Sequence, residues 1–388
     1  MGPTTLSTHF SGMGTVEAGV DYVRQLFPWV GVHTVASGDI SAKCRKLLLG
    51  GSQSCVFGNL LHESVLTPAM FATVKDLTAK ADLMYKTAMH VKNVAWCYQH
   101  NCYCKRVGGD VEMGGSPCVD HSRIGKRMGA KGSTFQLLLQ WCAWVLYSGC
   151  LLAIHENVLG FDDYWLYYML AEKYVIFKIL VHTCHVGFGK MCRRSRWYHV
   201  MVRKQGVRIM KDIAETYKAI AKYFEHIERE ESYGDFLNPA IKRKPRTVRK
   251  LFLTPKQCKR CIQYKKLWKH KFGIRAARDK RAYFHLNDNP HKRCVWSGKD
   301  GCLPTIRHSM GPLYAARHFR AVQADEVFVS MGFPERTSRP EATGMISIFP
   351  SALPSSAKKS LAGNGMHLVN ATMVLMVSLG CLESELRD

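Results

Sequence analysis

Short apolar runs alternate with helical patterns over the first half of the chain. Residues 5–10 predict a strand that leads into a turn of small residues, and residues 16–26 predict the helix after it. Residues 135–147 predict a further helix, and residues 150–154 predict a buried strand that ends near Glu156. Strands that alternate with helices in this way are typical of an α/β domain.

The pattern changes near residue 197. Apolar residues recur at helical spacing over 207–227, which predicts an amphipathic helix, and a basic stretch follows it. From about residue 302 the composition becomes ordinary again, and we expect a Ser/Ala/Lys-rich loop over 351–360 and a closing apolar helix. These changes predict three segments: 1–196, 197–301 and 302–388.

The charge balance of the chain indicates which class of partner it binds. The 388 residues include 55 Lys and Arg against 30 Asp and Glu, a formal net charge of +25 that favours nucleic acid first and an anionic membrane surface second. The basic stretch has almost no acidic residues, and Tyr264, Trp268 and Phe272 are interleaved with its charges. We therefore predict a nucleic-acid-binding surface there, with cations that include Arg243, Lys244, Arg246, Lys265 and Lys266.

Neither membrane spans nor metal sites are expected. The apolar stretches 137–154 and 366–382 are interrupted by polar residues, so we predict buried helices, with a strand closing the first stretch. Cys102-x-Cys104 and Cys258-x-x-Cys261 lack a second pair at standard zinc spacing, which predicts unrelated thiols, and His100 is expected to lie in a loop.

The N-terminus shows no secretory leader. It lacks a basic region followed by an apolar one, so we expect free thiols in a reducing intracellular compartment. Because the first small-residue turn begins at Phe10, we expect no reader domain before it.

Cys118 and Glu156 are the candidate reactive groups. Cys118 follows Pro117 in a glycine-rich loop that allows a ligand to approach closely, and Glu156 ends an apolar strand. A thiolate that attacks C6 of cytosine makes C5 nucleophilic, and a carboxyl group at N3 accommodates the electrons moved onto the ring. Arginines over 193–196 can supply the positive neighbourhood that a thiolate needs.

These residues and the motifs around them resemble the cytosine-C5 methyltransferase family, in the family's order across nearly the whole chain. Phe10-Ser11-Gly12-Met13-Gly14 resembles the family's opening cofactor loop, and Pro117-Cys118 with Ser122 and Gly125-Lys126-Arg127 resembles its nucleophile loop. Glu156-Asn157-Val158 resembles the base-contacting motif, and Arg194-x-Arg196 resembles the paired arginines. The closing motifs resemble Leu303-Pro304-Thr305, Arg320 with Glu326, Gly332-Phe333-Pro334 and Gly363-Asn364-Gly365-Met366.

The resemblance implies a Rossmann-like fold that binds S-adenosylmethionine, with a small target-recognition domain on the basic stretch. It implies DNA cytosine-C5 methylation with a flipped base: Cys118 attacks C6, Glu156 engages N3 and the amine, and Arg194 and Arg196 support the nucleophile loop and the base. Implied cofactor residues are Phe10, Gly12, Gly14, Asp39, Asn59, Pro117 and Asn364. Implied nucleic-acid contacts, besides the basic stretch, are Ser122, Lys126 and Arg127.

Four positions depart from the family pattern. Thr15 replaces a third glycine, Asn59 an aspartate, Cys192 a glutamine and His121 a phenylalanine. Thr15 and Asn59 predict weaker cofactor binding. They leave open a second interpretation, in which the chain is a relative that only binds nucleic acid. A tRNA methyltransferase also stays open, although its branch usually carries a Cys-Phe-Thr signature that is absent here. We expect a monomer that acts on double-stranded DNA, in the nucleus if the source is eukaryotic and otherwise in the nucleoid.

Overall fold

The computed structural model describes residues 3–51, 54–122, 125–183, 192–226, 237, 253–297, 302–307, 311–334 and 353–385. Contacts divide the chain into two compact units. The first unit comprises 1–181, 195–221 and 370–388, and the second comprises 182–194 and 222–369. The three segments expected from composition stay a prediction.

A seven-stranded sheet forms the centre of the first unit. Its strand order is β3-β2-β1-β6-β7-β9-β8, and its neighbours are parallel except where β9 runs antiparallel to β7 and β8. The strands are β1 (Thr4–His9), β2 (Val32–Gly38), β3 (Cys55–Phe57), β6 (Val111–Gly114), β7 (Leu152–Asn157), β8 (Tyr174–Val181) and β9 (Arg196–Arg203). The predicted mixed, mostly parallel α/β fold is confirmed.

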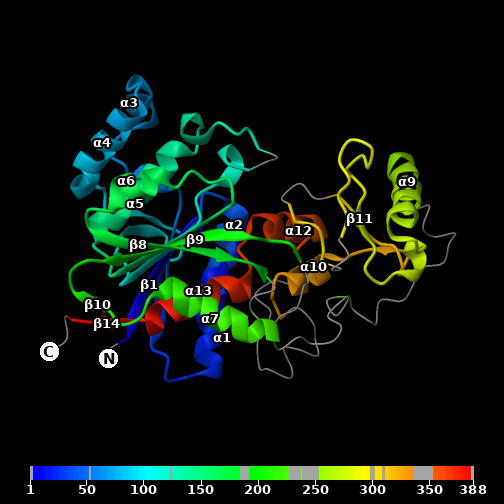
Figure 1. Cartoon of the computed structure of the whole chain (residues 1–388). Coiled ribbons are helices and arrows are strands. Elements are labelled where there is room, and N and C mark those ends of the chain that lie inside the picture. The colour runs from blue at the N-terminus through cyan, green and yellow to red at the C-terminus, as the bar shows by residue number, and fades with distance from the viewer. Residues whose placement is uncertain are drawn as a thin grey trace. The chain divides into compact units, whose positions relative to one another are not determined.

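Helices cover both faces of this sheet. Helices α5 (Phe135–Ser148) and α6 (Tyr164–Leu170) lie on one face, and α1 (Thr15–Leu26), α7 (Ile213–His226) and α13 (Leu368–Gly380) lie on the other (Figure 1). Helix α5 buries Trp141 and Trp144 completely. Gly19 of α1 faces α13 so closely that a Cβ there would lie 2.1 Å from Thr372 Oγ1, which requires glycine at this crossing.

The first unit also contains short elements at its periphery. A two-stranded hairpin pairs β4 (Val94–Cys97) with β5 (Cys102–Lys105), and β10 (Val207–Ile209) pairs with β14 (Leu382–Ser384). The remaining elements are α2 (Ala42–Gly51), η1 (Leu60–Glu63), α3 (Pro68–Thr73), α4 (Leu77–Thr87), η2 (Ala88–His90), η3 (Cys118–Asp120) and η4 (Gly129–Lys131).

The second unit packs a helix on a small antiparallel sheet. The sheet joins β11 (Tyr283–His285), β12 (Leu313–Ala315) and β13 (Arg320–Ala321), and the helices are α9 (Pro255–Phe272), η6 (Ala276–Arg278), α10 (Ala324–Ser330) and α12 (Ser355–Asn364). A Thr254 capping box starts α9, and Gly273 ends it with φ of 71°. Tyr264 of α9 stacks on Phe284 with ring centroids 5.2 Å apart.

Most local predictions from the first half of the chain are confirmed. Residues 5–10, 16–26 and 135–147 correspond to β1, α1 and α5. Stretch 137–154 is α5 followed by β7, and stretch 366–382 contains α13. No helix in the described part of the chain has both the length and the apolar character required to cross a bilayer.

Two local predictions are wrong. Residues 207–209 form β10 rather than the first turn of a helix, because they pair with β14 from the far end of the chain; the helix begins at Ile213. The sequence predicts a loop over 351–360, but α12 begins within it at Ser355, with Pro354 as its N-cap.

A buried ion pair stabilises the second unit. Arg320 donates from Nη1 and Nη2 to Glu326 at 2.7 and 2.6 Å, and both side chains are only 3% exposed. We expect Glu326→Ala to lower the free energy of unfolding by about 3 kcal/mol or more, because it leaves a guanidinium buried without its counter-ion. Urea denaturation measures this loss.

The matched control is Glu383→Ala, which breaks an exposed pair with Arg208. Its expected cost is below about 1 kcal/mol, because water screens exposed charges. Equal losses in the two variants would contradict the assignment of Arg320–Glu326 as a structural pair.

Candidate active site at the carboxyl edge of the sheet

Four loops that carry predicted site residues leave one edge of the sheet, and Glu156 lies at the end of a fifth strand there. The loops follow β1, β2, β3 and β6, and the fifth strand is β7. These five strands are adjacent and parallel, and we call the edge where they end the carboxyl edge. The register pairs His9 with Gly114 and Gly114 with His155, so the three central strands end at one level. Open α/β sheets bind ligands at this edge.

Side chains of β7 hold the nucleophile loop. Ser116 N donates to His155 Nε2 at 3.3 Å, and Asn157 Nδ2 donates to the Ser116 carbonyl oxygen at 3.1 Å. Burial lowers the pKa of His155 well below its usual value, so its ring is neutral and accepts at Nε2. Cys118 follows at the start of η3 with an exposed thiol.

Close packing maintains the rest of the nucleophile loop. Thr134 donates to Asp120 Oδ2 from its amide at 3.0 Å and from its hydroxyl at 2.8 Å. A Cβ at Gly132 would lie 2.0 Å from Asp120 Cγ, and one at Gly125 would lie 1.8 Å from the Val119 carbonyl oxygen. The glycines are therefore required where the loop folds back on itself.

Three predicted nucleic-acid contacts belong to this loop. Lys126 and Arg127 are exposed, and Arg127 has a left-handed φ of 55°. Ser122 is partly buried, and its hydroxyl accepts from Gly125 N at 3.0 Å. The loop thus presents two cations within ten residues of Cys118, while Ser122 shapes its turn.

Glu156 forms an ion pair with Arg196. Arg196 Nε lies 2.9 Å from Glu156 Oε1, and the two side chains are 14% and 11% exposed. The antiparallel pairing of β7 with β9 produces this contact, because β9 begins where β7 ends. Arg196 therefore orients the carboxyl group at the end of β7, the strand next to β6.

Arg194 and Asn364 belong to the second unit. Arg194 is 5% exposed and donates to the carbonyl oxygens of Gly363 and Gly365, which flank Asn364. Asn364 ends α12 with an exposed side chain. Arg194 thus positions the 363–365 turn, and its predicted action on the base stays a prediction.

The loop after β1 has the backbone of a ligand cradle. Phe10, Gly12 and Gly14 have positive φ values of 54°, 59° and 79°, and α1 begins at Thr15. Asp39 after β2 accepts from Gly12 N at 2.9 Å and from Ser41 N at 2.7 Å. Burial raises the pKa of Asp39. Asp39 therefore holds the loop, and its oxygens keep lone pairs for ribose hydroxyls.

Buried polar atoms beneath this loop fit a polar ligand. Glu17 accepts from Ser37 Oγ at 2.8 Å, yet its Oε2 and the Thr15 hydroxyl are buried without a hydrogen-bond partner. Such atoms are typical of a site that a ligand or water completes.

Asn59 begins η1. Its Oδ1 accepts from Leu61 N at 3.1 Å, so one lone pair and the amide NH₂ remain for a ligand. Asparagine in place of the family's aspartate therefore keeps an acceptor at this position but carries no charge.

The predicted aromatic surface on α9 is wrong. Tyr264 and Trp268 are completely buried in the core of the second unit. Their spacing of four residues places them on the apolar face of the helix, where they cannot stack on bases. Lys266 is exposed, whereas Lys265 lies partly buried with Nζ 5.2 Å from the ring centroid of Tyr314. Arg243, Lys244 and Arg246 lie outside the described residues.

One group of side chains was not predicted at all. Four side chains converge: Cys55, Cys97, His100 and Cys104. The sequence predicts Cys104 to be an unrelated thiol and His100 to lie in a loop. The run from Cys97 to Cys104 contains three of these residues and was the available signal. In the described part of the chain, Cys258 and Cys261 join no comparable group.

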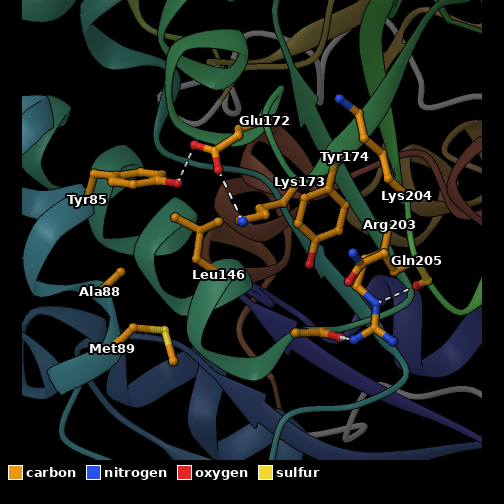
Figure 2. A pocket seen from close by; sticks show the side chains of 11 residues that line it. Tyr85, Ala88, Met89, Leu146, Glu172, Lys173, Tyr174, Arg203, Lys204 and Gln205 are labelled. Atoms are coloured by element: carbon orange, nitrogen blue, oxygen red, sulfur yellow. Dashed lines mark hydrogen bonds and ion pairs between the residues drawn. The ribbon is translucent and has the colours of Figure 1, made fainter.

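A pocket of about 380 Å³ lies at the opposite edge of the sheet from the site residues. It is formed where β7 and β8 begin and β9 ends, and Figure 2 shows Tyr85 and Lys173 directed at Glu172. Tyr85 donates to Glu172 Oε2 at 2.8 Å, and Lys173 Nζ lies 3.1 Å from Oε1. None of the predicted site residues lines this pocket, so we do not place the chemistry there.

Comparisons with known proteins indicate the fold. No protein-family model matches the sequence, and no curated protein matches it. Solved structures do match, each over 97% of this chain: the S. pombe Dnmt2 methyltransferase (15% identity, TM-score 0.53, 98% of that chain) and a putative DNA modification methyltransferase encoded within an E. coli prophage (15%, 0.54, 99%). A Spodoptera frugiperda DNMT2 mutant is similar (13%, 0.50, 99%). The chain therefore has the Rossmann-like methyltransferase fold.

Proposed function

We propose that this chain, which has the fold of these methyltransferases, belongs to the cytosine-C5 methyltransferase family and methylates C5 of cytosine in DNA. One observation carries the proposal. Cys118 follows β6, Glu156 lies at the end of the neighbouring parallel strand β7 and pairs with Arg196 of β9, and the glycine-rich loop after β1 leaves the same edge. This edge combines a nucleophile, an oriented carboxyl group and a ligand cradle.

Cys118 supplies the nucleophile. Its thiolate forms a bond to C6, and the displaced ring electrons are accommodated at N3, where Glu156 donates a proton or a hydrogen bond. This step requires the carboxyl group, which pairs with Arg196 in the free protein, to be protonated or to share a proton at that moment. C5 then carries the electron pair that takes up the methyl group. Loss of the C5 proton to a base restores the C5–C6 double bond, the bond from C6 to sulfur breaks, and Cys118 leaves as a thiolate.

S-adenosylmethionine would supply the methyl group from its sulfonium centre. The residues that would hold it lie after three adjacent strands: the loop from Phe10 to Gly14, Asp39 and Asn59. The positive φ values of the first loop let the backbone approach a ligand closely, and α1 begins directly after this loop. Pro117 completes the proposed set in the first unit.

Double-stranded DNA is the proposed partner, with the target cytosine flipped out of the helix. The net charge of +25 and the exposed cations Lys126, Arg127 and Lys266 support a polyanion. We propose that the protein acts as a monomer, in the nucleus of a eukaryotic source or in the nucleoid otherwise.

The salt dependence of DNA binding tests the basic face of α9. We expect Lys266→Ala to reduce the slope of log affinity against log salt by about 0.9, because one fewer phosphate contact releases one fewer counterion. Fluorescence anisotropy with a DNA duplex across a salt series measures the slope. The matched control is Lys204→Ala, an exposed lysine after β9. An unchanged slope in the Lys266 variant would remove α9 from the interface.

Trapping on 5-fluorocytosine DNA tests the proposed reaction directly. Fluorine at C5 cannot leave as a proton does, so the reaction should stop with the methylated base bound to sulfur. We expect a covalent adduct on denaturing gels that requires S-adenosylmethionine and is absent in Cys118→Ala. No adduct on DNA, but one on fluorinated tRNA, would replace DNA with tRNA as the substrate.

The second candidate function is nucleic-acid binding without catalysis. Asn59 and Thr15 favour it because they differ from the family pattern at the cofactor loops. Calorimetry separates the two functions: the proposed enzyme binds S-adenosylmethionine with saturable heat, whereas the binding-only protein does not. Absence of both cofactor binding and adducts would favour the binding-only function.

A further inference from the structure

Four metal-ligand atoms converge beside β3. The Nδ1 atom of His100 lies 3.6 Å from Cys55 Sγ, 3.4 Å from Cys97 Sγ and 3.5 Å from Cys104 Sγ. All four ligand atoms lie within 4.8 Å of one another. The group belongs entirely to the first unit and contains none of the residues assigned to methyl transfer.

These distances match the edges of a tetrahedral zinc site. Zinc bonds to sulfur at about 2.3 Å and to imidazole nitrogen at about 2.0–2.1 Å, which at tetrahedral angles separates sulfur from nitrogen by about 3.6 Å. The three observed separations fall within about 0.2 Å of that value. Hydrogen bonding alone does not require three thiols around one imidazole nitrogen.

The β4–β5 hairpin supplies three of the four ligands. Its register pairs Cys97 with Cys102 and Ala95 with Cys104, so Cys97 and Cys104 lie on the same face. A turn of four residues connects the strands, and Asn101 takes a left-handed φ of 52° directly after His100. The turn thereby returns the imidazole toward the two thiols of the strands.

The fourth ligand comes from the main sheet. Cys55 begins β3, and the hairpin is attached to that strand by a hydrogen bond from Tyr98 N to the Val56 carbonyl oxygen at 2.8 Å. Cys97 is fully buried there against Phe57 and Ala36. A metal ion at this point would join a peripheral hairpin to the edge strand of the seven-stranded sheet.

We propose that Cys55, Cys97, His100 and Cys104 bind one structural Zn²⁺ ion in the first unit. Three thiolates and one imidazole complete a closed tetrahedral set and leave no position for a substrate, which is typical of a structural site. Cys102 is a fifth thiol, 3.7 Å from Cys104 Sγ, but it is exposed and outside the group of four. It is therefore assigned as a non-ligand.

The ion would stabilise the wall behind Asn59, one of the predicted cofactor residues. Tyr98 packs on Gly58, where a Cβ would lie 3.5 Å from the ring, and the Arg45 guanidinium lies 4.1 Å above the same ring. Gly58 precedes Asn59. This consequence for cofactor binding rests on the proposed function, whereas the metal site does not.

Metal content of the full chain tests the proposal without any activity measurement. The protein is expressed with added zinc, purified under reducing conditions without chelators, dialysed, and analysed by inductively coupled plasma mass spectrometry. We expect one zinc ion per chain in the wild type and a loss of at least tenfold in His100→Asn and Cys104→Ser. Because His100 is exposed, its replacement does not disturb buried packing.

Two matched thiol variants serve as controls. Cys102→Ser removes the neighbouring thiol and Cys258→Ser removes a thiol of the second unit, and both should retain one zinc ion. Replacement of zinc by Co²⁺ should produce thiolate charge-transfer absorption that His100→Asn weakens and Cys102→Ser preserves. Zinc well below one per chain after anaerobic reconstitution, or equal zinc in all variants, would overturn the proposal, whatever the methylation assays show.

Discussion

Replacing Cys118 with alanine is expected to reduce the rate of methyl transfer by on the order of 10⁴-fold or more. Without the bond from sulfur to C6, C5 of cytosine has too little electron density to accept a methyl group. Cys118 is exposed at the start of η3, so its replacement should leave the stability of the fold unchanged. Single-turnover transfer of a labelled methyl group to DNA measures the rate.

Cys294→Ala is the matched control for this variant. Cys294 is also exposed as a residue, but it lies in the second unit, and partial burial of its thiol raises the pKa of this group to about 11. Its removal should leave the rate of transfer unchanged. A Cys118→Ala protein that transfers methyl groups at the wild-type rate would contradict the covalent mechanism.

The second large effect is expected for Glu156→Gln. The amide still pairs with Arg196 and accepts a hydrogen bond from the exocyclic amine of cytosine, but it cannot deliver a proton to N3. We expect kcat to fall by about 10²–10⁴-fold, the range for loss of a general acid, with a much smaller change in KM. Steady-state kinetics on a DNA duplex separate the two parameters.

Glu172→Gln is the control for loss of a carboxylate. Glu172 lies in the pocket at the opposite edge of the sheet, where it pairs with Tyr85 and Lys173. Its replacement should leave both kinetic parameters within about twofold of the wild type, since nothing at the carboxyl edge contacts it. If Glu156→Gln raised KM and left kcat unchanged, Glu156 would bind the base without activating it.

The carboxyl edge was predictable because its residues follow strands with strong local signals. The strand ending at His9 and the glycine turn after it are encoded by adjacent residues, and the same is true of the strand before Glu156. Parallel strands bring such loops to one edge without further information. The contact between Arg196 and Glu156 is different: it depends on β9 running antiparallel, which no local pattern indicates.

Long-range pairing explains the errors. Val207 fits a helical repeat, but pairing with Ser384 places it in a strand. The proposed zinc ligands were not predicted from the sequence for the same reason, because Cys55 lies far from the hairpin in sequence and joins it only through the sheet. The prediction for Tyr264 and Trp268 is wrong for a different reason. Their spacing indicated one face of a helix, and only the density of nearby lysines suggested that this face lies at the surface, whereas both side chains are buried.

The close crossing of α1 and α13 has a consequence for synthesis of the protein. Residues 370–388 belong to the first unit, and β14 completes its contact with β10. A ribosome must therefore translate the whole second unit before the first can close. Until then, the surface of α1 around Gly19 lacks its partner helix. The nascent chain should thus recruit holding chaperones late in translation, and supplying residues 366–385 in trans should release them.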